Sequence, residues 1–215
     1  MHRRRRTALV LSAVIAAAAP ALTACGNDAH PGAAAVVGGQ RITVAQLQSR
    51  VDEVRQAQRA AVPDAAQYER VVARTGTLAR DTLHQLVLNR VLDRAARDAG
   101  VSVSRREIQQ MRTGLERQAG GRKGLQTAWL QQYGVPPKRL DENLRLQLEA
   151  QKLATKLHSD TSRPEFWKAL SDASRSLRID LNPRYGSWDV QKSTRVETKS
   201  PWLRDVSTQT AQQTA

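Results

Sequence analysis

The chain has 215 residues and a formal net charge of +14, with 34 Lys and Arg against 20 Asp and Glu. This length favours one domain with tails, and the single Cys excludes an intramolecular disulfide. A cytosolic chain with so high a positive charge would be expected to bind nucleic acid. The N-terminal segment, described next, instead predicts export, so we expect no nucleic-acid partner.

The first 24 residues have the pattern of an export signal. Four arginines, Arg3 to Arg6, precede an apolar run of about 14 residues from Ala8 to Ala21. This run is shorter than the roughly 20 apolar residues that span a bilayer. Residues 1–24 are therefore expected to be cleaved, which leaves 191 residues with a charge of +10.

The segment Leu22-Thr23-Ala24-Cys25 resembles the lipobox of bacterial lipoproteins. The resemblance implies that Cys25 is acylated, becomes the first mature residue and anchors the protein to the outer face of the cell membrane. Acylation also explains a lone thiol in an exported chain. The alternative is an ordinary secretory signal in which Cys25 is incidental. Residues 25–33, small and polar, are predicted to be a flexible tether.

The N-terminal half of the predicted domain combines a hairpin with several helices. Strand-like residues flank Gly38-Gly39 between Ala34 and Ile42, which favours a hairpin with a two-residue turn. Capping residues and apolar residues at helical spacing then predict four helices. The first helix starts at the Thr43/Gln46 capping box and runs to about Ala60, and the second starts near Ala65. The third covers Thr77–Ala99, where the apolar positions are wider than one surface stripe, and it is the predicted central and most buried helix. The fourth starts at the Ser104/Glu107 capping box.

The C-terminal half predicts three more helices and one strand. The helices are Leu125–Tyr133, a long helix from Pro136-Pro137, and one opened by a Ser162/Glu165 capping box with Pro164 in its first turn. Alternating apolar residues from Leu177 to Leu181 predict a strand, whose only strand-like partner is the N-terminal segment. These elements predict a mainly α domain over residues 34–182, which is closed by a small sheet formed from its two ends. Residues 183–215 are predicted to be a mostly disordered tail.

The order of these parts resembles the SurA N-terminal domain of the SurA/PrsA-type chaperone family. The resemblance rests on Ala35 to Thr43 leading into a helix, on Gly100-Val101-Ser102-Val103-Ser104 before Glu107-Ile108, and on a long helix containing Leu144 to Leu148. It implies a helical domain that holds unfolded exported polypeptides. Many such chaperones also carry a parvulin isomerase domain, but only 33 residues follow Asn182, so isomerase activity is not expected.

Residues suited to catalysis or metal binding are scarce. There is no H-E-x-x-H, no G-x-S-x-G turn, and the glycines at 120–124 lack the Lys-Ser/Thr ending of a phosphate loop. His84 and His158 are the only histidines in the predicted domain. The sequence therefore predicts no enzyme, no cofactor, no metal site and no small-molecule substrate.

Four aromatic residues are the candidate polypeptide-binding residues, since an apolar surface is what an unfolded client would contact. They are Trp129, Tyr133, Phe166 and Trp167. Packing in the core is the alternative for each of them. We expect a lipid-anchored, chaperone-like protein that binds unfolded or newly exported polypeptides. The alternative function is a structural or adaptor lipoprotein that docks on one folded partner or on the cell wall.

Overall fold

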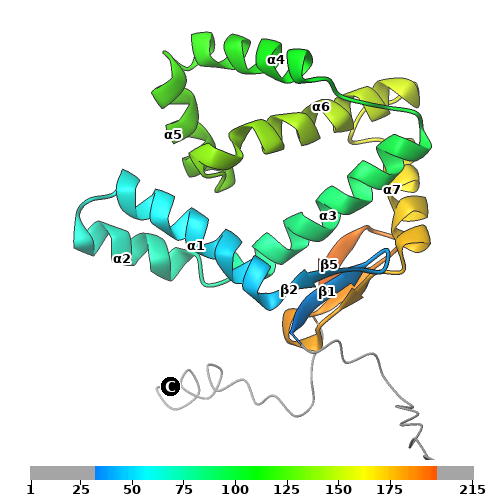
Figure 1. Ribbon diagram of the computed structural model, residues 1–215, viewed down its shortest axis with the longest axis horizontal. Coiled ribbons are helices and arrows are strands. Elements are labelled where there is room, and N and C mark those ends of the chain that lie inside the picture. The colour runs from blue at the N-terminus through cyan, green and yellow to red at the C-terminus, as the bar shows by residue number, and fades with distance from the viewer. Residues whose placement is uncertain (1–31, 198–215) are drawn as a thin grey trace, which may run out of the picture.

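The computed structural model describes residues 32–197, and Figure 1 shows the arrangement of its elements. The signal sequence, Cys25, most of the tether and residues 198–215 lie outside this range, so the predictions about them stay predictions. Seven α-helices and small antiparallel sheets make up the described part, which confirms the mainly α fold class. Between residues 32 and 197, no helix combines the length and the apolar character that crossing a bilayer requires. The α-helices are α1 Val44–Ala61, α2 Ala65–Arg74, α3 Leu78–Asp98, α4 Arg105–Gln118, α5 Arg122–Tyr133, α6 Leu140–Lys156 and α7 Pro164–Leu177.

A three-stranded sheet joins the two ends of the domain, as the sequence predicts. Strand β1 (Ala33–Val37) pairs antiparallel with β2 (Gln40–Thr43) through the Gly38-Gly39 turn, in which both glycines have positive φ. On its other edge β1 pairs with β3 (Asp180–Leu181), with Ala35 opposite Leu181. The sheet order is β2-β1-β3.

The main core surrounds α3, the longest helix, which the sequence predicts to be the central and most buried one. Leu83, Val87 and Val91 are fully buried on it. Helices α1, α6 and α7 and strand β1 pack around it. Burial on so much of its circumference explains why its apolar stripe is wider than that of a surface helix.

Helices α4 and α5, the short 3-10 helix η1 (Pro137–Arg139) and the first half of α6 form a helical arm with its own small core. Leu125, Leu140 and Leu144 are buried there, away from the main core. The second half of α6 then enters the main core through Leu153. In Figure 1 the arm extends above α1 and α3.

The prediction of a disordered tail is wrong for residues 183–197. After the 3-10 helix η2 (Pro183–Tyr185), strands β4 (Ser187–Asp189) and β5 (Thr194–Val196) form a hairpin. Trp188 packs against the main core and its indole Nε1 donates a hydrogen bond to Ser174 Oγ at 3.3 Å. Ser174 Oγ lies 2.9 Å from Ser193 Oγ in the interior. Tertiary burial therefore orders a segment whose composition is polar.

Three boundaries in the C-terminal half differ from prediction. The Ser162/Glu165 capping box is wrong, because the N-cap of α7 is Arg163 and Ser162 instead hydrogen-bonds to Asp160. Pro164 occupies the first helical position, which shifts the cap by one residue. Pro137 opens η1, and α6 begins only at Leu140. The third difference is at Leu177, which ends α7, so that β3 is limited to two residues.

Candidate functional site

A groove with a pocket of about 460 Å³ lies where the helical arm faces α1 and the N-terminal half of α3. Its volume is within the range of ligand-binding pockets. Apolar side chains from all three sides line it, and so do uncharged polar and charged groups. The apolar lining residues are Val54, Leu78, Leu86, Tyr133, Val135, Pro136 and Leu146.

Tyr133 is the most prominent aromatic residue of the groove. It is the last residue of α5, next to Gly134, whose positive φ of 64° ends the helix in a left-handed cap. About half of its surface, 52%, is exposed. Its ring packs edge to face on Trp129 at 5.4 Å between centroids. Trp129 in turn packs on the arm core and donates from Nε1 to Asn143 Oδ1 at 3.0 Å. Trp129 thus positions Tyr133 at the groove.

Uncharged hydrogen-bonding groups also face the groove from α3. Thr82, Gln85 and Asn89 are spaced at i, i+3 and i+7, which places them on one side of the helix. Within residues 32–197 their side chains have no hydrogen-bond partner, and neither does the amide nitrogen of Asn143 across the groove. Such groups can pair with the backbone of an extended polypeptide without regard to its sequence.

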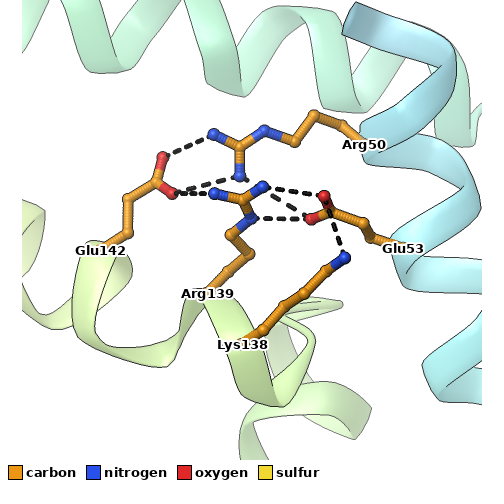
Figure 2. Close-up of polar contacts among 5 residues, drawn as sticks. All are labelled: Arg50, Glu53, Lys138, Arg139 and Glu142. Carbon is orange, nitrogen blue, oxygen red and sulfur yellow. Dashed lines mark hydrogen bonds and ion pairs between the residues drawn. The ribbon is translucent and has the colours of Figure 1, made fainter.

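A network of five charged residues links the arm to α1 beside the groove (Figure 2). Arg139 donates two hydrogen bonds to Glu53, from Nε to Oε2 at 2.7 Å and from Nη2 to Oε1 at 2.8 Å. Lys138 Nζ lies 3.1 Å from the same carboxylate. On the other side, Arg50 donates to both oxygens of Glu142, at 3.0 and 3.1 Å, and Arg139 donates to Glu142 at 3.2 Å.

Glu53 is the central acceptor of this network and is 8% exposed. The hydrogen bonds from Arg139, helped by Lys138, lower the pKa of Glu53 to about 2 even though burial acts in the opposite direction. The Glu53 carboxylate is therefore charged at neutral pH, and Arg139 binds it in a bidentate arrangement. This geometry is stronger than a single contact and fixes the spacing between α1 and η1, which sets the width of the groove.

The four aromatic candidates lie as two pairs on different helices. Trp129 and Tyr133 belong to α5 and contact the groove region. Phe166 and Trp167 belong to α7, with ring centroids 5.9 Å apart, and neither of them lines the groove. Phe166 is 4% exposed and packs in the main core, whereas 41% of Trp167 is exposed. Cys25 lies outside the described residues.

Sequence reasoning did not find the charged network. A signal was present, because Arg50 and Glu53 fall on the same side of α1 as the buried Leu47 and Val54. Arg139 lies 86 residues from Glu53 in the chain, so their pairing depends on the tertiary fold. His84, one of the two histidines of the predicted domain, has its ring centroid 5.6 Å from that of Trp188, and its Nδ1 accepts a hydrogen bond from the Arg195 backbone N–H.

Comparison with known proteins gives one family. A model described as the SurA-like N-terminal domain matches residues 1–154, which include the hairpin, α1 to α5 and most of α6. The matched part contains every element that lines the groove. The chain matches no curated protein and no solved structure.

Proposed function

The chain belongs to the SurA-like N-terminal domain family, and from this we propose that it holds unfolded polypeptides reversibly in the groove between the arm, α1 and α3. Domains of this family bind unfolded polypeptides. The observation that supports the groove as the site is the combination of an exposed Tyr133, apolar walls and free uncharged hydrogen-bonding groups in one pocket. No nucleotide, cofactor or catalytic group takes part in the proposal.

The chemistry of the groove suits an extended client. An apolar client side chain would pack on Tyr133 and Leu86, and the client backbone would bond to Thr82, Gln85 and Asn89. The charged network of Glu53 and Arg139 is already paired, so it offers little to charged clients. The groove is therefore proposed to prefer uncharged, apolar segments.

We also propose that the protein works outside the cytoplasm, attached to the membrane by acyl chains on Cys25. Support comes from the basic and apolar segments before Leu22-Thr23-Ala24-Cys25. Two acyl chains on one residue give stable anchoring where one chain gives only reversible binding. Mass spectrometry of the native N-terminal peptide tests this proposal: a peptide that begins at acylated Cys25 supports it, and an intact residue 1–24 segment with a free thiol refutes it.

The holding function is tested by the suppression of aggregation of a chemically denatured client, followed by light scattering. Full-length protein with Cys25→Ser is used throughout, so that acyl chains cannot take part. We expect suppression by this protein, and about tenfold weaker binding of a fluorescent apolar peptide after Tyr133→Ala, because one central aromatic residue often contributes 1–2 kcal/mol or more.

Trp167→Ala is the matched control, since Trp167 is also exposed but lies on α7, outside the groove. It should bind peptide like the parent protein. Loss of binding in Trp167→Ala with normal binding in Tyr133→Ala would move the site to α7. If neither suppression nor peptide binding occurs, and a pull-down recovers one stoichiometric folded partner, the adaptor alternative replaces the chaperone proposal.

A further inference from the structure

A second pocket, larger than that of the groove, lies between the C-terminal half of α3, the C-terminal end of α7 and the β1–β2 turn. Its volume is about 1000 Å³ and the turn of the β1–β2 hairpin, Gly38-Gly39, forms part of its rim. Arg90, Arg94 and Arg97 line it from α3, and Arg178 lines it from the end of α7. These four residues and this space are called the arginine pocket below.

The three arginines of α3 are spaced at i, i+4 and i+7, so one side of the helix presents all of them. Arg178 reaches the same pocket from another helix because it ends α7 with a positive φ of 45°. A non-glycine residue in this conformation is uncommon and strained. The chain therefore places a guanidinium at a position where glycine is the usual helix-ending residue.

Among residues 32–197, few carboxylates pair with these arginines. Arg94 pairs with Asp98, and Asp93, a lining carboxylate, pairs with Arg145 from α6. Arg90 donates to the neutral backbone carbonyls of Gln40, at 2.9 Å, and Arg41, at 3.4 Å, and to no carboxylate among the described residues.

In the part of the chain from 32 to 197, neither Arg97 nor Arg178 has a carboxylate partner. Asp180 is the remaining acidic residue of the lining and has no cation partner in that same range. Counting partners from residues 32–197 alone, the pocket thus carries three guanidinium groups without a carboxylate partner and one carboxylate without a cation partner.

From this arrangement we propose that the arginine pocket binds a phosphate-type anion. Guanidinium groups present parallel N–H donors that match phosphate oxygens, and three residues that carry them line this one pocket from α3 and from the end of α7. Burial lowers the pKa of Arg90, and a bound anion would oppose that effect. The pocket volume of about 1000 Å³ holds a single phosphate and also leaves room for a larger phosphate ester. The ligand is therefore either free phosphate or a phosphate-bearing lipid headgroup.

The test is calorimetric titration of full-length Cys25→Ser protein at constant ionic strength. One titrant is inorganic phosphate and the other is glycerophosphoglycerol, the soluble headgroup of phosphatidylglycerol. We expect saturable binding that weakens as NaCl is added. Tighter binding of glycerophosphoglycerol identifies the lipid headgroup as the source, and tighter binding of inorganic phosphate identifies the free ion. Absence of saturable binding by both titrants overturns the proposal.

Two variants separate a binding site from a structural role. Arg97→Gln with Arg178→Gly should weaken binding about tenfold, since exposed charged contacts are individually weak but two are lost. Arg178→Gly should by itself raise the thermal midpoint, because glycine relieves the positive φ, while binding falls.

Arg105→Gln with Arg106→Gln removes two charges from the exposed start of α4, and this control should bind like the parent. Equal losses in both double variants would mean that only overall charge matters, which overturns the proposal.

Discussion

Replacing Glu149 by Gln is expected to stabilise the protein at pH 8 and to leave its stability nearly unchanged at pH 4.5. Glu149 lies on α6, is 8% exposed, and its Oε2 is buried without a hydrogen-bond partner within residues 32–197. Its other oxygen contacts Arg145, whose Nη1 also donates to Asp93 Oδ1 at 2.9 Å. The Arg145 guanidinium therefore contacts two carboxylates, those of Glu149 and Asp93.

Burial, with the neighbouring carboxylate of Asp93, raises the pKa of Glu149 to about 7 from its ordinary 4.5. The folded state then holds a proton that the unfolded state releases, so stability falls as pH rises from 4.5 to 7. The pKa of Glu149 differs by about 2.5 units between the folded and the unfolded state. At 1.36 kcal/mol per pKa unit, the free energy of unfolding therefore falls by at most about 3 kcal/mol. Gln keeps the shape and the hydrogen-bond donor of the protonated acid but does not ionise.

The measurement is urea unfolding, followed by far-UV circular dichroism, of parent and variant full-length protein at pH 4.5, 6, 7 and 8. The stability advantage of Glu149→Gln should grow from near zero to about 2–3 kcal/mol across this series. Glu69→Gln is the control, because Glu69 is exposed on α2, and its difference from the parent should stay flat. A flat or declining difference for Glu149→Gln would refute the reasoning.

Three further changes test the packing and capping described above. Leu144→Ala should lower the unfolding free energy by about 2–5 kcal/mol, since Leu144 is fully buried in the small arm core, and urea unfolding measures it. Ser104→Ala should cost about 1 kcal/mol, because the Ser104 hydroxyl accepts from the Glu107 backbone at 3.3 Å; Ser104→Gly should cost less. Glu53→Gln should cost up to about 3 kcal/mol at pH 7 and much less at pH 2, since the pKa of Glu53 is lowered to about 2 and its stabilising charge is lost on acidification. Equal costs at both pH values would contradict that assignment.

The sequence was sufficient to predict elements defined by local patterns. The Thr43 and Ser104 capping boxes form as expected, with both reciprocal hydrogen bonds. The pairing of β1 with β3 was predictable because only two segments of the predicted domain alternate like strands, and an isolated strand needs a partner. Tyr133 was a candidate because aromatic residues are scarce in this chain; it lines the groove, and its role in binding stays a prediction.

The features that the sequence did not predict depend on contacts between residues that lie far apart in the chain. The β4–β5 hairpin has the polar composition of a disordered tail, and it is held by the packing of Trp188, the buried contact of Ser174 with Ser193 and the hydrogen bond from the Arg195 backbone to His84. Glu53 and Arg139 look like ordinary surface charges until the fold brings α1 and η1 together. Both features arise from contacts between segments that local periodicity cannot relate.

The central position of β1 has a consequence for the time course of folding. Its Ala35 pairs with Leu181, almost at the other end of the domain, so a chain that emerges N-terminus first carries an unpaired strand edge until the last helix has followed. Such late closure slows folding and leaves the nascent chain open to edge-to-edge association. During synthesis β1 therefore stays without its β3 partner until residues 180–181 have been made.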